Sequence, residues 1–298
     1  MRVAILHAGR FSTVGHLWDA VKEEMATAGW RDGVNIEYIS REANGDLTRL
    51  DRLAAELLAE KPDLILAGTR PVAQAVQKRT STIPIVFMAV PDPVAAGLVD
   101  SLAKPGRNAT GPAGSFPGLW GKRLQLFGEV ISSLRHVAFL YDPSDSMDDT
   151  NLPLAQAAAK ELALELHLIA TKGPEDFRRS FAAMKSAKVG AALIGYGTFS
   201  FNHRKLLADV AIEYRVPTSA GTREQVEAGM LMGYAVIVTN MFRAGARYAD
   251  RILRGARPAD LPVEQAAVLE LALSLKTAKV LGITLPPSIL LRADRVIE

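Results

Sequence analysis

The stretch Gly68-Thr69-Arg70 has residue types that could bind an anionic or hydroxyl-bearing ligand. It ends an apolar run, residues 63–69, and opens a helical pattern. Threonine at this place is typical of a helix N-cap, so Thr69 either caps the helix or binds a ligand together with the free amides of the first turn. Arg70 could pair with a carboxylate through two parallel hydrogen bonds, although an arginine at a helix start is more often solvated. Both alternatives stay open at this stage.

A second polar segment follows the next apolar run, residues 84–90. Asp92 stands there between two prolines, which restrict the backbone on either side of it. Its carboxylate is expected to cap the turn that follows more often than to contact a ligand.

Short apolar runs alternate with helical patterns through most of the chain. The runs at 2–8, 63–69 and 84–90 are almost continuously apolar, which is typical of strands covered on both faces of a parallel sheet. A Pro-, Gly- and Asn-rich passage, residues 102–116, interrupts the alternation and indicates a boundary, after which the alternation restarts. The pattern predicts an α/β fold with two doubly wound parallel-sheet lobes joined by a multi-strand hinge.

The chain of 298 residues suits two lobes of similar size. We expect lobe one over residues 1–113, with part of 235–263 returning to it. Lobe two is expected over 114–234, with part of 264–298. The last stretch is too short for a third domain and is expected to thread back between the lobes.

The candidate ligand-binding residues lie mostly at or just beyond the carboxyl ends of predicted strands. Ligands bind there in open α/β sheets, so we expect the two edges to face each other across a cleft. Phe11, Tyr196 and Phe199 are expected to pack the apolar part of the ligand, and Tyr234 to lie near the hinge. The candidates are Arg10, Phe11, Gly68, Thr69, Arg70 and Asp92 in lobe one, and Tyr141, Ser144, Tyr196, Thr198, Phe199, Arg223 and Tyr234 in lobe two.

Catalytic signatures are weak in this sequence. It has no cysteine, which excludes thiol nucleophiles, disulfides and cysteine metal sites. It has no GxSxG elbow and no phosphate loop, and the turn after the first strand lacks GxGxxG. The histidines are scattered, with no pair at metal-ligand spacing and no clear carboxylate partner. We therefore expect no catalytic residue, no metal site and no cofactor. The five histidines are His7, His16, His136, His167 and His203.

Charge and hydropathy argue against a nucleic-acid partner and against a membrane-spanning helix. Lys and Arg number 35 against 32 Asp and Glu, and the charges are interspersed, so nucleic acid is not an expected partner. No apolar run approaches the roughly 20 residues of a membrane-spanning helix. The chain opens directly on a predicted strand without the features of a leader, so we expect either a protein whose leader was removed or a cytoplasmic one.

Two segments, "PGRNATG" at 105–111 and "LKTAK" at 275–279, carry a family resemblance. Together with "KRLQL" at 122–126 and the close at 273–298, they resemble the ABC-transporter substrate-binding proteins of the tryptophan-binding-protein type, from about residue 15 to the C-terminus. The resemblance implies a type I periplasmic-binding-protein fold, no catalysis, and delivery of a small ligand to a membrane permease. Some characterised relatives bind aromatic amino acids.

The sequence departs from that family at two places near the expected cleft. The family commonly has an Asp where this chain has Tyr196 or Gly197, and it commonly reads Gly-Gly-Leu-Met-Ser-Tyr-Gly over residues 229–235. The missing carboxylate removes a partner for a ligand ammonium group, while Arg10, Arg70 and Arg223 indicate a ligand carboxylate.

We therefore expect the substrate-binding protein of an ABC importer. It would close on a carboxylate-bearing solute (an amino acid, or an aromatic or other organic acid) by hinge motion. The expected partners are that solute and a membrane permease, with the chain a monomer in the periplasm or another extracytoplasmic space. A ligand sensor of the same fold that feeds a signalling partner is the alternative, and an α/β enzyme is the third.

Overall fold

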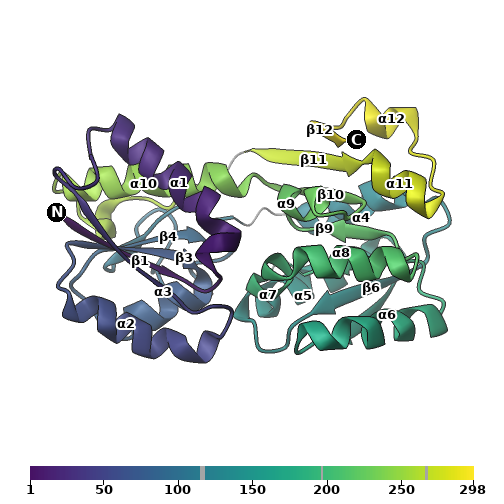
Figure 1. The fold of residues 1–298 in the computed structure, drawn as a ribbon, viewed down its shortest axis with the longest axis horizontal. Helices are drawn as coiled ribbons and strands as arrows, with labels where there is room; N and C mark the ends of the chain where they lie inside the picture. The colour runs from purple at the N-terminus through teal and green to yellow at the C-terminus, as the bar shows by residue number, and fades with distance from the viewer. Residues whose placement is uncertain (115–117, 196, 266–267) are drawn as a thin grey trace. The chain divides into compact units, whose positions relative to one another are not determined.

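The computed structural model describes residues 1–114, 118–195, 197–265 and 268–298, with only the backbone for residues 146–150. The chain divides into two compact units, each built from two stretches of sequence (Figure 1). Unit 1 consists of Met1–Ser115 and Val238–Ala267, and unit 2 of Phe116–Ile237 and Val268–Glu298.

Unit 1 is built on a parallel sheet with the strand order β2-β1-β3-β4-β5. The chain passes from β1 to β2 on one side and then returns to β3 on the other side of β1. The strand order therefore reverses between β1 and β3, and this place is the topological switch point of the sheet. The strands are β1 (Arg2–His7), β2 (Glu37–Glu42), β3 (Leu64–Thr69), β4 (Ile85–Ala89) and β5 (Ala109–Thr110).

Helices cover both faces of this sheet, as Figure 1 shows, with α1 and α10 on one face and α2 and α3 on the other. Helix α10 lies so close to β4 that a Cβ atom added at Gly245 would stand 2.0 Å from the sulfur of Met88. The helices are α1 (Phe11–Thr27), α2 (Leu50–Ala59), α3 (Arg70–Gln77) and α10 (Val238–Leu253), with 3-10 turns at Leu47–Arg49 and Pro258–Asp260.

Unit 2 has the strand order β12-β11-β10-β9-β8-β6-β7. Its switch point lies between β6 and β8, because β7 is added on one side of β6 and the later strands on the other. The strands are β6 (His136–Tyr141), β7 (Glu165–Ala170), β8 (Ala191–Ile194), β9 (Thr218–Ala220), β10 (Met232–Val236), β11 (Leu269–Ser274) and β12 (Arg295–Ile297).

The helices of unit 2 also form two layers. Helices α4 and α5 pack over one apolar cluster, which contains Trp120 and Phe139, and α6 and α8 pack over another, which contains Phe177 and Phe181. The helices are α4 (Leu119–Val130), α5 (Ser146–Glu161), α6 (Phe177–Ser186), α7 (Thr198–Asn202), α8 (Arg204–Glu213), α9 (Arg223–Glu227), α11 (Leu275–Leu281) and α12 (Pro287–Leu290), with a 3-10 turn at Pro174–Asp176.

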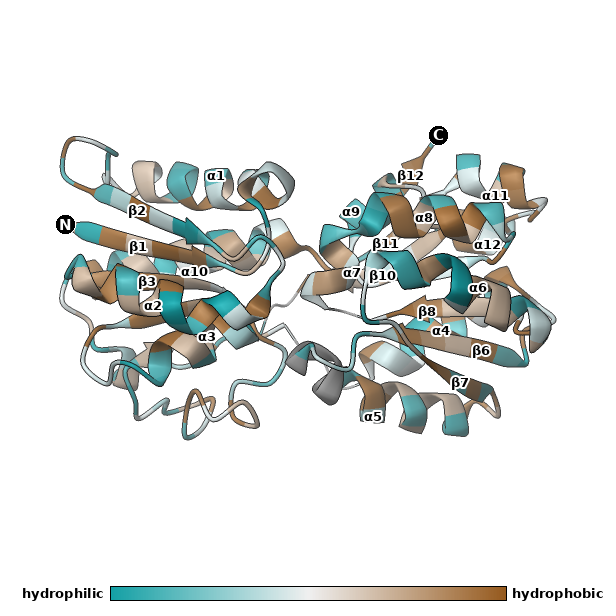
Figure 2. Cartoon of the chain, turned by 60° about the horizontal axis from the view of Figure 1, so that its bottom comes forward, coloured by the Kyte–Doolittle hydropathy of each residue, from teal (hydrophilic) through white to brown (hydrophobic). Residues whose placement is uncertain are grey.

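The apolar runs of the sequence form the central strands. Figure 2 shows β1 and β6 brown along most of their length, while teal residues colour the outer helices α2 and α6. All side chains from Val3 to Leu6 are buried, as expected for a strand covered on both faces. Among the described residues, no helix has the length and apolar character that crossing a bilayer requires.

Two features differ from the sequence-based expectation. The passage 102–116 contains the division between the two units, as expected for a boundary, but it also contains the unpredicted strand β5, which extends the sheet of unit 1. The sheet of unit 2 is not wholly parallel, because β11 runs antiparallel to β10. A short connection between two strands indicates that they are antiparallel. Here the chain passes through helix α10 of unit 1 between β10 and β11, so the sequence contained no such indication.

Candidate functional site

The switch point of unit 1 brings together the loops that follow β1 and β3. In the register of these strands Leu6 lies beside Ala67, so His7 and Gly68 come next at the carboxyl edge. The chain then enters α1 on one face of the sheet and α3 on the other. Backbone and side chains at such a divergence are where ligands bind in open α/β sheets. Five of the predicted residues lie here: Arg10, Phe11, Gly68, Thr69 and Arg70.

Thr69 is the N-cap residue of α3, yet its side chain makes no capping hydrogen bond. Its hydroxyl oxygen Oγ1 is buried and has no hydrogen-bond partner among the described residues. A buried hydroxyl without a partner costs about 1–3 kcal/mol, so proteins keep few of them. Of the two alternatives for Thr69, the structure shows no capping by its side chain, and ligand binding stays a prediction.

Gly68 has a packing role that the sequence did not reveal. A Cβ atom at this position would stand 2.5 Å from Cδ2 of the His7 ring and 3.2 Å from the Trp18 ring. The two rings meet edge to face with centroids 5.7 Å apart. Gly68 is therefore needed because the imidazole of His7 lies directly over it.

His7 itself is a buried, neutral histidine. Burial lowers its pKa from 6.5 to about 4, an effect that the hydrogen bond with Gly9 opposes in part. Its Nδ1 accepts a hydrogen bond of 2.8 Å from the backbone N–H of Gly9, which places the ring proton on Nε2. His7 thus shapes the loop into α1.

The first turn of α1 already has an acidic partner. The backbone N–H of Phe11 donates to the Glu42 carboxylate, which comes from the end of β2. Arg10 is the exposed N-cap residue of this helix, and its side chain does not cap it. Glu42 was not among the predicted residues, because nothing in the sequence shows that the end of β2 lies beside the end of β1.

The remaining predicted residues of unit 1 have different roles. Asp92 accepts hydrogen bonds from the backbone N–H groups of Val94 (3.1 Å) and Ala95 (2.9 Å), so the expected capping of the turn is confirmed. Arg70 is half-buried as the first residue of α3, beside Thr69.

At the switch point of unit 2, a buried carboxylate connects the segments that follow β6 and β8. Asp145, in the loop after β6, accepts a hydrogen bond of 2.7 Å from the backbone N–H of Thr198, the first residue of α7, which follows β8. The Oγ1 atom of Thr198 is buried without a partner among the described residues, as in Thr69. The hydroxyl of Ser144 donates to Asp142 at 2.7 Å, and the Ser144 backbone N–H donates to the same oxygen. Asp142, not Ser144, organises this turn.

The aromatic candidates of unit 2 pack at the margins of its core. Tyr141 is half-buried, with its ring 6.2 Å from that of Phe139. Phe199 lies against Phe177, with ring centroids 5.4 Å apart. Tyr196 lies outside the described residues, so the predicted aromatic wall of a pocket stays a prediction.

Arg223 is already paired with acidic side chains. Its guanidinium lies 3.3 Å from Glu270 and 3.7 Å from Glu227. Burial raises the pKa of the Glu270 carboxyl, and the nearby Arg223 opposes that rise. A ligand carboxylate at Arg223 would have to compete with both glutamates.

Tyr234 lies in the middle of β10 and not at the carboxyl edge. It lines a hollow of about 330 Å³ together with Lys122 and Arg292. Its backbone oxygen accepts a hydrogen bond of 3.1 Å from Nε of Arg123, a fully buried arginine whose guanidinium stacks 4.4 Å from the Trp120 ring. Arg123 was not predicted as a functional residue, because an arginine in an amphipathic helix is normally exposed; its only signal was the "KRLQL" segment.

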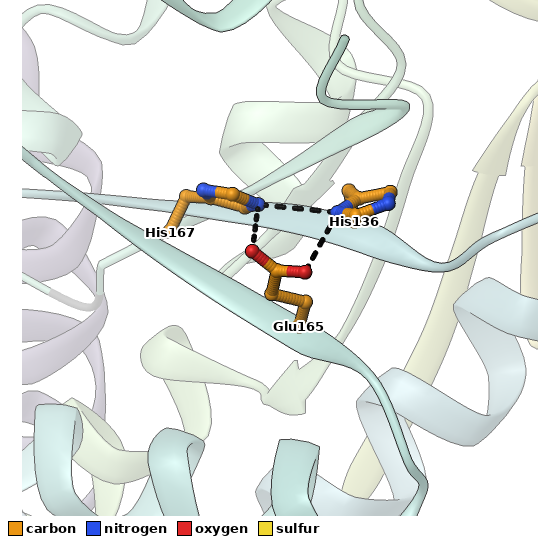
Figure 3. Close-up of side chains that lie close together, drawn as sticks. All are labelled: His136, Glu165 and His167. Atoms are coloured by element: carbon orange, nitrogen blue, oxygen red, sulfur yellow. Dashed lines mark hydrogen bonds and ion pairs between the residues drawn. The ribbon is translucent and has the colours of Figure 1, made fainter. Parts of the chain in front are cut away.

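One expectation about the histidines is wrong. His136 and His167 lie close to each other and both contact Glu165, at 3.2 Å each (Figure 3). The sequence separates the two histidines by 31 residues, and only the pairing of β6 with β7 brings them together. This cluster is at the amino ends of the two strands, whereas the switch point of unit 2 is at their carboxyl ends.

The two α/β units, each with a topological switch point in its sheet, have the fold of the type I periplasmic-binding-protein class. The chain belongs to the family described as "ABC transporter substrate binding protein", which matches residues 2–297. Members of this family bind solutes and are not enzymes.

Individual proteins are similar to this chain in sequence or in fold. A "Tyrosine-binding protein" of Clostridioides difficile is 27% identical over 255 residues, which are 85% of this chain and 72% of the relative. The crystal structure of an ABC domain in complex with L-Trp, from Streptococcus pneumonia, is 23% identical, covers 99% of both chains and has a TM-score of 0.93. A leucine-binding protein of Thermotoga maritima has a TM-score of 0.65 at 16% identity, over 85% of this chain and 83% of its own.

Proposed function

We propose that this chain binds a small organic solute that carries a carboxylate, an amino acid or an aromatic acid, and delivers it to an ABC permease. The observation that carries this proposal is the buried hydroxyl of Thr69, which has no partner among the described residues and stands at the N-terminus of α3. The proposal also draws on the relatives named for tyrosine and L-Trp.

The surroundings of Thr69 favour an anionic group. The first amides of α3 and the positive end of its dipole lie beside the hydroxyl, and Arg70 adds a cation at the same turn. A carboxylate oxygen would accept the hydrogen bond that the Thr69 hydroxyl lacks. In unit 2, Thr198 offers a second buried hydroxyl at the corresponding switch point. That one solute contacts both edges, with the units closing around it, stays a prediction.

Three matched compounds test which ligand group is recognised: tyrosine, 3-(4-hydroxyphenyl)propionate, which lacks the amine, and tyramine, which lacks the carboxylate. A second trio, of tryptophan, 3-indolepropionate and tryptamine, extends the test. Calorimetric titration and thermal shift give the affinities, since a ligand of the folded form raises the melting temperature. We expect binding by carboxylate-bearing members and none by the two amines. Stronger binding of tyramine or tryptamine would contradict the proposal.

The comparison of the amino acids with their amine-free acids tests the departure at Tyr196. Loss of the family's usual aspartate predicts that the amine contributes little, so the acid should bind as tightly as the amino acid. A clear preference for the amino acid would place an ammonium partner elsewhere in the chain.

The variant Thr69→Val tests the residue that carries the proposal. It replaces the hydroxyl by a methyl group of similar size, so we expect the affinity for the best ligand to fall by about 10- to 150-fold, since one hydrogen bond to a charged group is worth roughly 1.5–3 kcal/mol. The ligand-free protein should keep its stability or gain some, because an unpartnered polar group has been removed. Unchanged affinity would exclude Thr69 from the site.

Delivery to a permease and an extracytoplasmic location are tested in cells. Deleting the gene should abolish uptake of the radiolabelled ligand, and the protein should fractionate outside the cytoplasm. Normal uptake in the deletion strain would favour the ligand-sensing alternative.

A further inference from the structure

The amino ends of β6 and β7 carry three side chains with metal-binding atoms on one face of the sheet of unit 2. His136 lies directly opposite Glu165 in the strand register, and Ala138 lies opposite His167. Residues two apart on a strand point to the same face, so Glu165 and His167 share a face with His136. Figure 3 shows the two rings and the carboxylate converging on one point.

The separations of the three donor groups fit a tetrahedral metal ion. Nδ1 of His136 lies 3.3 Å from Nε2 of His167. The two Glu165 oxygens lie 3.2 Å from these nitrogens, one oxygen to each. Two donor atoms that are each about 2.05 Å from a tetrahedral zinc ion stand about 3.3 Å apart. Each separation is therefore that of two neighbouring ligands around one such ion, and the Glu165 carboxylate places one oxygen beside each nitrogen.

We propose that His136, Glu165 and His167 form a site for a divalent transition metal, with Zn²⁺ the best fit. Two imidazole nitrogens and one carboxylate suit zinc and its neighbours in the transition series, whereas Mg²⁺ and Ca²⁺ prefer oxygen ligands. The three ligands stand on two hydrogen-bonded strands, which hold them in place without a loop. His136 and Glu165 are exposed, so water or another molecule can supply the fourth ligand.

The site is separate from the switch point of unit 2, where Thr198 is proposed to contact the solute. It lies at the amino ends of strands whose carboxyl ends form the switch point of unit 2. Each strand has six residues, which span about 20 Å at 3.3 Å per residue. Zinc binding should therefore occur without the solute, and solute binding without zinc.

Calorimetric titration of the untagged, EDTA-treated full chain with Zn²⁺ tests the proposal. We expect one zinc ion per chain and no heat from Mg²⁺ at the same concentrations. Affinity should fall at least tenfold in His136→Ala and in His167→Ala, because each removes one of three protein ligands. His16→Ala is the matched control, since His16 is an exposed histidine of unit 1, and it should bind zinc as the unchanged chain does.

A spectroscopic readout separates this site from binding elsewhere. Cu²⁺ bound to the chain should show two nitrogen ligands by electron paramagnetic resonance, and the double variant His136→Ala, His167→Ala should lose that signal while keeping its circular dichroism spectrum. Equal zinc affinity in the double variant and the unchanged chain would overturn the proposal, as would an equal loss in His16→Ala. Either result would leave the cluster a surface ion pair.

Discussion

The two units use the same topology at their switch points but connect the two strand ends there in different ways. In unit 1 the contact between β1 and β3 is a neutral one, in which the His7 ring lies over Gly68. In unit 2 the contact between β6 and β8 is made by a charged group, because Asp145 accepts the backbone N–H of Thr198. Both edges nonetheless keep a buried threonine hydroxyl at the start of a helix, Thr69 and Thr198.

This difference shows that the topology determines where the two strand ends meet, while the side chains present determine which kind of contact joins them. A neutral packed contact fails when a charge is introduced or when volume is added. A charged hydrogen bond fails when its acceptor is removed. The two edges can therefore be disturbed separately by different changes.

Acid should disturb unit 1 through His7. Its pKa is lowered from 6.5 to about 4, so the folded form binds fewer protons than the unfolded form between these values. The stabilisation is fully present above pH 6.5 and is lost as the pH falls through 4. By pH 4 the loss should reach roughly 3 kcal/mol, at 1.36 kcal/mol per pKa unit. Urea unfolding as a function of pH measures it.

The variant His7→Asn is the control for this prediction, because the amide oxygen can replace Nδ1 as the acceptor for Gly9. Its stability should depend less on pH between 6.5 and 4. In a Trp120→Phe background the remaining tryptophans are Trp18 and Trp30, which both lie in unit 1. Their fluorescence then follows the unfolding of unit 1. A nuclear magnetic resonance titration that places the His7 pKa near 6.5 would contradict the prediction without any variant.

Removal of the Asp145 carboxylate should disturb unit 2. Asp145→Ala leaves the Thr198 N–H buried without its charged acceptor, and we expect a loss of about 2 kcal/mol in the free energy of unfolding. Asp209→Ala is the control, because Asp209 is exposed and pairs only with Lys205 along one helix among the described contacts, so its loss should stay under about 0.5 kcal/mol. Equal effects of the two variants would mean that Asp145 does not stabilise the switch point.

Added volume at Gly68 should have the smallest of the three effects on the free energy of unfolding. Gly68→Ala pushes a methyl group into the His7 ring, and we expect a loss of about 1.5 kcal/mol. Gly15→Ala, on α1, has no atom within 4 Å of the new Cβ and should be neutral or stabilising, because alanine favours helix over glycine. The contrast is measured by thermal unfolding, and a neutral Gly68→Ala would show that the His7 ring can move aside.

The sequence predicted the fold class and the central strands because each depends on local patterns. Almost continuous apolar runs marked β1, β3 and β4, and the alternation of apolar runs with helical patterns continued after the passage 102–116. Strand β5 was missed because its two residues lie in a Pro- and Gly-rich passage. The antiparallel pairing of β11 was missed because strand direction depends on where the preceding helix α10 packs.

For the candidate residues, the sequence predicted their places at strand ends better than it predicted the contacts of their side chains. Thr69 was expected at a strand end next to a helix, and it lies there. That its hydroxyl does not cap the helix depends on the orientation of a side chain, which no local pattern encodes. Arg223 was singled out for its charge, but its partner Glu270 lies 47 residues away, so its pairing could not be predicted.

By itself, the order of apolar and polar residues determined that strands and helices alternate and that small polar residues follow the strands, because burial and turn formation act over a few neighbouring positions. Only the tertiary structure decided which distant side chains meet: His7 with Gly68, Asp145 with Thr198, and His136 with Glu165 and His167. Those contacts depend on strand register and on which face each helix covers, and a shift of one residue in the pairing of β6 with β7 would turn Glu165 and His167 to the face opposite His136.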